Sequence, residues 1–201
     1  QWQLTTPEIP QGVAVSLPVE VRVTYDYSTN GHLKIPALSD QEFEIRRIKN
    51  QQIASHEIVN SDGPLKITIP ESFQRPVIVD TEDPATVESI PLRIEIVNVG
   101  SGFPITQGQL GRITGTIRLF GPGVEFEDCL GATSGGQVNL DSTEIPTKLR
   151  DTQSVPIPCS IRINKAQWGG AARPEDLITL VFNINYKYYV KQSVSVKVSG
   201  K

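Results

Sequence analysis

Hydrophobic and polar residues alternate most regularly between Leu177 and Val198, close to the end of the chain. Such alternation predicts a β-strand with one face buried and the other in water. A short polar link, Lys191-Gln192, divides the stretch into two runs. We therefore predict a hairpin that closes an antiparallel sandwich. The buried face of the first run would carry Leu180, Phe182, Ile184, Tyr186 and Tyr188.

A second long alternation runs from Val13 to Tyr27 near the start of the chain. Pro18 interrupts it, which predicts a bulge or a change of strand there, because proline cannot donate to a strand ladder. Asn30-Gly31 is a typical hairpin-turn dipeptide, so we expect the chain to reverse there. A short return strand would follow at residues 32–35.

One helix is predicted in this largely β pattern. Ser39 is followed three residues later by Glu42, which matches the capping box at the start of helices. The Ser hydroxyl and the Glu carboxylate would bond the backbone N–H groups of the first turn. We expect a short helix at about residues 40–50, followed by a strand at 65–69.

The segment 70–75 is the best candidate for a domain boundary, because prolines flank it between two β-runs. After it, roughly seven short strands are punctuated by turns, which is typical of an immunoglobulin-like sandwich. The predicted fold class is all-β, with two immunoglobulin-like antiparallel β-sandwich domains and one short helix in the first. The predicted units are an arm at 1–10, a first domain at 11–70 and a second at 76–201.

Composition narrows the classes of function. The 201 residues carry a net charge of −3, which gives no electrostatic reason to expect nucleic-acid binding. No apolar run approaches the roughly 20 residues of a membrane-spanning helix. The sequence has no methionine, not even at position 1, so either a signal peptide was removed or the chain was trimmed. We favour the removal of a signal peptide from an exported protein.

The first ten residues form an arm in which Trp2 and Leu4 share a face before Pro7 and Pro10 interrupt. Two interpretations remain open. The arm is either a first strand that frays into solvent or an arm that pairs with a neighbouring subunit.

Cys129 and Cys159 are the only cysteines. In an exported chain this pair predicts a disulfide. Two separate thiols are the alternative, whereas a structural metal site would want four ligands. The placement of the disulfide between two sheets in antibody domains offers an analogy.

No catalytic site is evident in the sequence. His32 and His56 are the only histidines, and both are predicted to be surface residues without a nucleophile beside them. The acidic clusters at residues 80–83 and 125–128 are interpreted as solvated loops. A calcium site is the alternative interpretation, although the spacing of a calcium loop is missing. We expect no other cofactor.

Two aromatic residues are candidate partner contacts. Trp168 stands in a Q-W-G-G loop and either contacts a partner or covers one end of the second core. Tyr189 directly follows Tyr188, so it falls out of step with the alternation and should point to solvent or to a partner.

Several segments carry a resemblance to a known group of proteins. They are V-T-Y-D-Y-S-T at 23–29, R-P-V-I-V at 75–79, L-R-I-E-I-V-N-V-G-S-G-F-P-I at 92–105, P-C-S-I-R-I at 158–163 and the alternating C-terminal run. Together they resemble uncharacterised archaeal secreted or membrane-anchored surface proteins with paired β-sandwich domains. The resemblance implies a location at the cell surface and supplies no catalytic residues.

The sequence favours a non-enzymatic, extracellular structural subunit of a filament or layer. Sandwiches leave unpaired edge strands, which an extended arm can complete in a neighbour. The expected partners are copies of itself or other surface proteins. The alternative is an adhesion module that recognises glycan or protein through loops such as 164–176.

Overall fold

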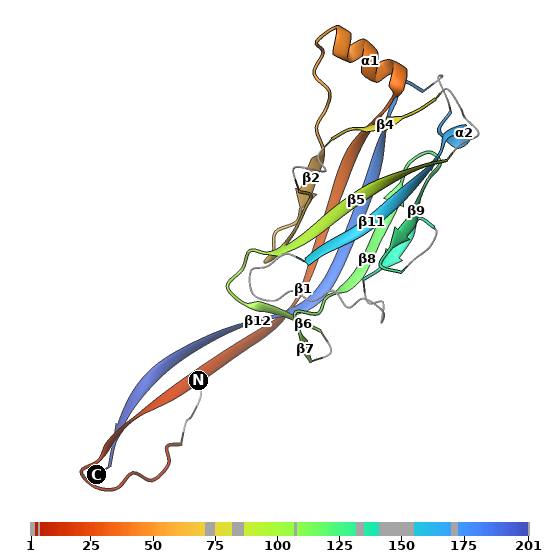
Figure 1. The fold of residues 1–201 in the computed structure, drawn as a ribbon. Coiled ribbons are helices and arrows are strands. Elements are labelled where there is room, and N and C mark those ends of the chain that lie inside the picture. The colour runs from red at the N-terminus through yellow and green to blue at the C-terminus, as the bar shows by residue number, and fades with distance from the viewer. Residues whose placement is uncertain are drawn as a thin grey trace.

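The computed structural model describes residues 3, 5–70, 75–81, 87–106, 108–131, 135–140, 155–169 and 173–200. The described chain is all-β apart from two short helices, and it forms two sheets that face each other (Figure 1). Its elements are β1 (Ala14–Ser39), α1 (Asp40–Ile48), β2 (Glu57–Asn60), β3 (Leu65–Thr68), β4 (Val77–Val79), β5 (Val87–Asn98), β6 (Phe103–Thr106), β7 (Gln109–Leu110), β8 (Thr114–Phe120), β9 (Val124–Cys129), β10 (Gln137–Asn139), β11 (Val155–Asn164), α2 (Lys165–Trp168) and β12 (Glu175–Ser199).

The larger sheet has eight strands. Its main order is β10-β8-β12-β1-β2, with β4 joined to β1, β6 to β12 and β7 to β6. The smaller sheet has four strands in the order β3-β5-β11-β9. Neighbouring strands are antiparallel, except that β4 runs parallel to the end of β1. Alternate side chains of the two sheets meet to form the core, as the alternation predicts.

The two longest strands, β1 and β12, pair with each other without interruption. The register runs from Ala14 opposite Ser199 to Leu38 opposite Glu175, so the whole 25-residue length of β12 is paired. The predicted hairpin within 177–198 is therefore wrong, because Lys191 and Gln192 continue β12 and pair with β1. Pro18 also causes no shift of register in this pair.

The predicted turn at Asn30-Gly31 is likewise wrong, because both residues lie inside β1. Gly31 is needed there for another reason. A Cβ atom at this position would lie 2.7 Å from the carbonyl oxygen of Val59, so only glycine lets β2 approach β1 this closely. The dipeptide resembles a turn, but long-range pairing on both sides of β1 holds the chain extended.

The buried side chains form one continuous cluster between the sheets. It includes Leu33, Ile35 and Leu65 from the predicted first domain, and Ile94, Phe182 and others from the second. Strands from both sides of the predicted boundary at 70–75 contribute to each sheet. The boundary therefore does not divide the core.

The predicted helix is confirmed as α1, which begins directly after Ser39. The Ser39 hydroxyl oxygen accepts a hydrogen bond from the Glu42 backbone N–H at 3.2 Å, as an N-cap does. Glu42 also accepts from Arg46, one turn later, at 2.6 Å. Local sequence signals determine this element, in contrast to the strands around it.

The predicted disulfide between Cys129 and Cys159 is confirmed. The two residues lie directly opposite each other on β9 and β11, which are neighbours in the smaller sheet. The bond therefore joins two strands of one sheet and does not link the two sheets as in antibody domains. Both cysteines are buried in the core cluster.

We predict that reduction of this disulfide lowers the free energy of unfolding by about 3–4 kcal/mol, because the bond closes a 30-residue loop in the unfolded chain. Urea denaturation of the oxidised and reduced chains measures the difference. The double variant Cys129→Ala/Cys159→Ala separates the cross-link from the packing of the sulfur atoms. Equal unfolding midpoints before and after reduction would contradict this prediction.

Candidate functional site

The outer halves of β1 and β12 leave the body of the protein as a two-stranded ribbon. The ribbon consists of Ala14–Thr24 and Tyr189–Ser199, and its far end, where β1 begins and β12 ends, lies well away from the body (Figure 1). The last strand that pairs with β12 before the ribbon is β6, which ends its pairing opposite Tyr189. On the other side, the pairing of β2 with β1 stops at Gly31. Beyond Tyr189, none of the described strands pairs with either outer edge of the ribbon.

One face of the ribbon is almost entirely apolar. Residues that stand opposite each other across two strands share a face. Nine aliphatic side chains share this apolar face with one polar residue, Gln192. They are Val15, Leu17, Val19, Val21, Val23, Val190, Val194, Val196 and Val198.

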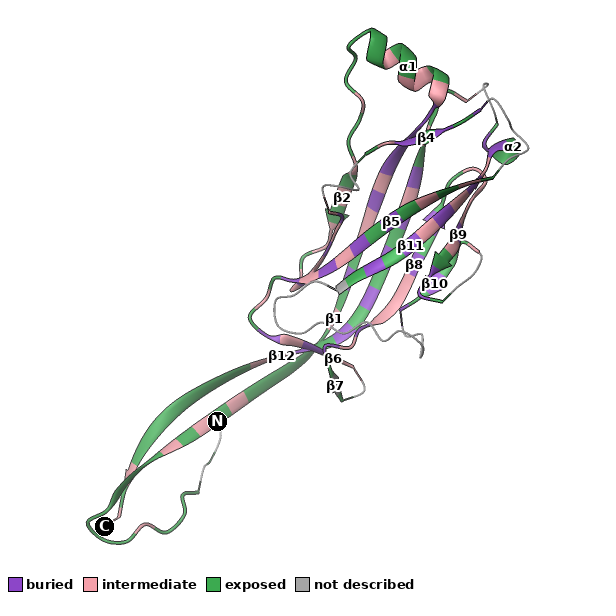
Figure 2. Ribbon diagram, in the orientation of Figure 1, coloured by how far each residue is buried: buried purple, intermediate pink, exposed green. Residues whose placement is uncertain are grey.

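The apolar face of the ribbon continues the core face of the larger sheet. The same alternation leads from Val23 through Tyr25 to Leu33, which is completely buried in the body. On the ribbon, however, neither sheet of the described chain covers this face, and Val23 and Val194 are 52% and 59% exposed. Figure 2 shows the change along the two strands from buried in the body to exposed on the ribbon. The ribbon thus has the surface of a sandwich interior without the second layer.

A tyrosine cluster closes the core at the base of the ribbon. The Tyr188 hydroxyl donates to Oδ1 of Asn98 at 2.9 Å and accepts from the Gly102 backbone N–H at 2.8 Å. Asn98 ends β5, and its amide also donates to the Gly102 carbonyl oxygen. These bonds attach the end of the smaller sheet to β12, so the second layer stops at this point.

Two neighbouring tyrosines extend the cluster. The Tyr186 hydroxyl lies 2.8 Å from the Thr29 hydroxyl, and its ring stacks on that of Tyr27 with centroids 5.9 Å apart. Burial raises the pKa of the Tyr186 phenol, and burial likewise raises the pKa of Tyr188. Both rings therefore favour the neutral form.

The opposite face of the ribbon is polar and carries both signs of charge. Glu20 and Arg22 form an ion pair there at 2.5 Å, and Lys191 and Lys197 lie on the same face. Tyr189 also lies on this face, half-exposed, with its ring 5.6 Å from that of Phe103. Its orientation away from Tyr186 and Tyr188 is as predicted, and its role as a partner contact stays a prediction.

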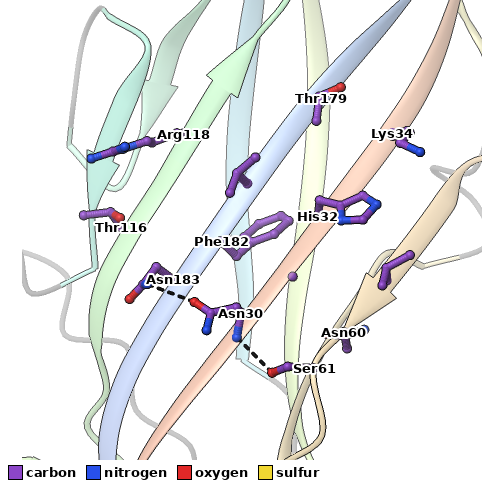
Figure 3. Close-up of a pocket in the computed structure, with 13 residues that line it drawn as sticks. Asn30, His32, Lys34, Asn60, Ser61, Thr116, Arg118, Thr179, Phe182 and Asn183 are labelled. Carbon is purple, nitrogen blue, oxygen red and sulfur yellow. Dashed lines mark hydrogen bonds between the residues drawn. The ribbon is translucent and has the colours of Figure 1, made fainter.

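A separate concavity of about 890 Å³ lies on the outer face of the larger sheet (Figure 3). Most of the residues that line it are polar, and Asn183 donates to Oδ1 of Asn30 across the β1–β12 pair at 2.9 Å. His32 and Arg118 also line it, from β1 and β8. His56 lines a different cavity, where its Nε2 lies 2.9 Å from the Arg75 carbonyl oxygen and burial lowers its pKa. The two histidines are therefore not brought together.

The structure corrects one predicted contact residue. Trp168 is completely buried, because α2 turns its ring into the core, so the ring is not available to a partner. The Asn164 side chain caps the start of this four-residue helix, and Gly169 ends it in the left-handed conformation at φ 102°. The interpretation that Trp168 covers part of the core is the one that the structure supports.

The structure describes only some of the other residues that the sequence singled out. Trp2 and Leu4 of the arm, and Glu82 and Asp83 of one acidic cluster, lie outside the described residues. In the other acidic cluster, Glu125 pairs with Arg162. Within the described ranges, no three His, Cys, Asp or Glu side chains lie close enough to share a metal ion. No helix in the described part of the chain has the length and apolar character to span a membrane.

Searches of protein families, of curated protein sequences and of solved structures find no match to this chain. The resemblance to archaeal surface proteins therefore stays an expectation, and the ribbon itself is the feature that points to a function.

The sequence showed the alternating residues of the ribbon, but it did not show that these two strands leave the body with their apolar side exposed. The alternation of Val15, Val19 and Val23 on one strand and Val194 and Val196 on the other was visible. It predicted two half-buried strands, because alternation cannot reveal whether a second sheet covers the apolar side. The useful signal was length, since both runs exceed what a typical strand of the sandwich needs.

We predict that the tyrosine cluster makes the fold sensitive to high pH. Because burial raises the pKa of Tyr186 and Tyr188 in the folded state, their contribution to stability is complete below pH about 10 and is lost as the pH rises above it. Urea denaturation at pH 8 and pH 11 measures this loss, and absorbance of tyrosinate follows the ionisation.

The variant Tyr188→Phe provides the comparison. It should cost about 1–3 kcal/mol at pH 8, because Asn98 and Gly102 lose a buried hydrogen-bond partner. It should also lose less further stability between pH 8 and pH 11 than the unchanged chain. An equal loss in both proteins would show that Tyr188 is not a source of the pH dependence.

Proposed function

We propose that this protein is a non-enzymatic structural subunit of an extracellular assembly, and that the ribbon is its main docking element. The observation that carries the proposal is the apolar face of the ribbon, which continues the core face yet is covered by no strand that the structure describes. An isolated two-stranded ribbon is at best marginally stable in water. A contiguous exposed apolar surface, here formed by nine aliphatic side chains, marks an interaction site in a folded protein.

The edges of the ribbon support the same proposal. The unpaired backbone groups of Ala14–Thr24 and Val190–Ser199 are available to strands of another molecule. The predicted arm begins where it can reach such an edge, because Gln11 forms a bridge with Gly200 at the tip of the ribbon. Main-chain pairing through the arm and packing through the apolar face are two distinct contacts, and a filament or layer needs at least two.

The disulfide fits an extracellular location, since such bonds persist in oxidising compartments. We also propose that the two facing sheets form an immunoglobulin-like sandwich. The alternative function, recognition of glycan or protein, has less support at the predicted loop 164–176, because Trp168 is buried. The polar concavity on the outer face of the larger sheet is the better location for it.

We predict that Val19→Lys weakens assembly of the purified chain about a hundredfold, because it places an unpaired charge in the centre of the apolar contact. Ser193→Lys is the matched control, since it adds the same charge on the opposite face, beside Glu20. Light scattering over a range of concentrations measures the effect, and thermal unfolding verifies that both variants fold.

The assembly measurements also distinguish a structural subunit from a binding module. Assembly that responds equally to both substitutions, or to neither, would reject the ribbon as the docking element. A chain that remains monomeric at every concentration would reject self-assembly and favour the binding module.

We predict that deletion of residues 1–10 stops the growth of long assemblies and leaves the fold intact. No described residue of the arm is buried, and the core cluster contains none of them. Negative-stain microscopy of the full and shortened chains shows the result. Filaments or layers of equal length in both would reject a role for the arm.

A further inference from the structure

The composition of the apolar face of the ribbon also indicates which surface packs on it in the assembly. This inference rests on the proposed function. The occupant must present an apolar sheet face without charge, because nine aliphatic side chains and Gln192 are all that the ribbon offers on this side. In the described part of the chain, the surface with this length and composition is the ribbon itself. A second copy therefore supplies a matching face.

The lengths and areas are consistent with such a pair. Eleven residues per strand extend over roughly 36 Å, and stacked sheets lie roughly 10 Å apart. Two ribbons packed face to face remove on the order of 1,000 Å² from water, close to the lower end of specific interfaces. The polar faces, with Glu20, Arg22, Lys191 and Lys197, then remain in water on the two outer sides.

The position of the smaller sheet determines how the two ribbons are oriented. In the body, the smaller sheet packs across β1 and β12 (Figure 1), and it covers the face that the alternation continues as the apolar face of the ribbon. If two stacked ribbons pointed in the same direction, the smaller sheet of each copy would occupy the space of the larger sheet of the other. If they point in opposite directions, the two bodies lie at opposite ends and do not collide.

We propose that two copies of this chain stack their ribbons antiparallel, apolar face on apolar face, around a two-fold axis beside the Val19–Val194 pair. Each ribbon then lies in line with the smaller sheet of the other copy and continues its layer. The tip of one ribbon, at Val15 and Val198, approaches the base of the other, at Val23 and Tyr25. The two-layer sandwich extends without a break from one body to the other.

This contact is isologous, so it closes at two copies. Longer assemblies then require the arm, and a chain without residues 1–10 still forms the dimer. Gln192 faces the cross-strand pair of Leu17 and Val196 in the partner copy. It lies at a strand edge, where its amide can reach water.

Single cysteines on the full chain test the arrangement. Val19→Cys lies at the axis, so a short bis-maleimide linker should join two copies into a covalent dimer. A linker is needed because stacked sheets are too far apart for a direct disulfide. The native cysteines are buried in their disulfide and do not react. Val194→Cys, directly opposite Val19, provides a second variant with the same expectation.

Val15→Cys distinguishes the orientation. In the antiparallel stack its two copies lie roughly 26 Å apart, eight strand residues, so it should not link to itself. Mixed with Val23→Cys, it should form the heterologous dimer. Ser193→Cys on the polar face measures random linking.

Efficient linking of Val15→Cys to itself would overturn the antiparallel stack. So would linking of both Val19→Cys and Val194→Cys no faster than Ser193→Cys. If assembly still depends on Val19 in light scattering, that result leaves the ribbon as a docking element and removes only the two-fold arrangement. If assembly is insensitive to Val19→Lys, both proposals fail.

Discussion

The pairing of β1 with β12 is the constraint on which the rest of this structure depends. It joins the start of the described fold to its end, along the whole 25-residue length of β12. Inside the body, the pair is the centre of the larger sheet and carries the core residues Leu33, Phe182 and Ile184. Outside the body, the same ladder continues with the same alternation. One element therefore builds both the stable core and the exposed docking surface.

The boundary between these two parts is set by side chains at the end of the smaller sheet. Tyr188 and Asn98 close the core by bonding the turn at Gly102. Gly102 itself permits this closure, because a Cβ atom there would lie 2.1 Å from the Tyr189 carbonyl oxygen. Beyond this point the valines of the ribbon have neighbours along and across the two strands, but no described strand lies opposite them as a second layer. The hydrophobic effect that folds the body is available on the ribbon only through association.

The sequence predicted those features that depend on local patterns. The alternating faces of β1 and β12, the capped helix α1 and the pairing of Cys129 with Cys159 were all accessible in this way. It failed where long-range pairing overrides a local signal. Asn30-Gly31 has the composition of a turn, yet it lies between β2 and β12 and is extended. Lys191-Gln192 has the polarity of a loop, yet both residues pair with β1 inside the ribbon.

The docking surface was hidden from the sequence for a related reason. An exposed apolar face and a buried one have the same period-two pattern, so valines of the ribbon and of the core cannot be distinguished without the second sheet. Trp168 shows the converse, because a tryptophan next to two glycines suggested an exposed contact and proved to be core. Burial depends on the whole arrangement of layers, which only the structure provides.

Hydrogen exchange of the ribbon amides, measured over a range of protein concentrations, tests directly whether the ribbon is an assembly surface. If association covers the apolar face, the amides between Val15 and Val23 exchange slowly at high concentration and quickly after dilution. Amides between Leu33 and Ile35 in the body should stay protected throughout, because they lie in the core of the larger sheet. Ribbon amides that exchange equally fast at every concentration would contradict the assignment of the ribbon as an assembly surface.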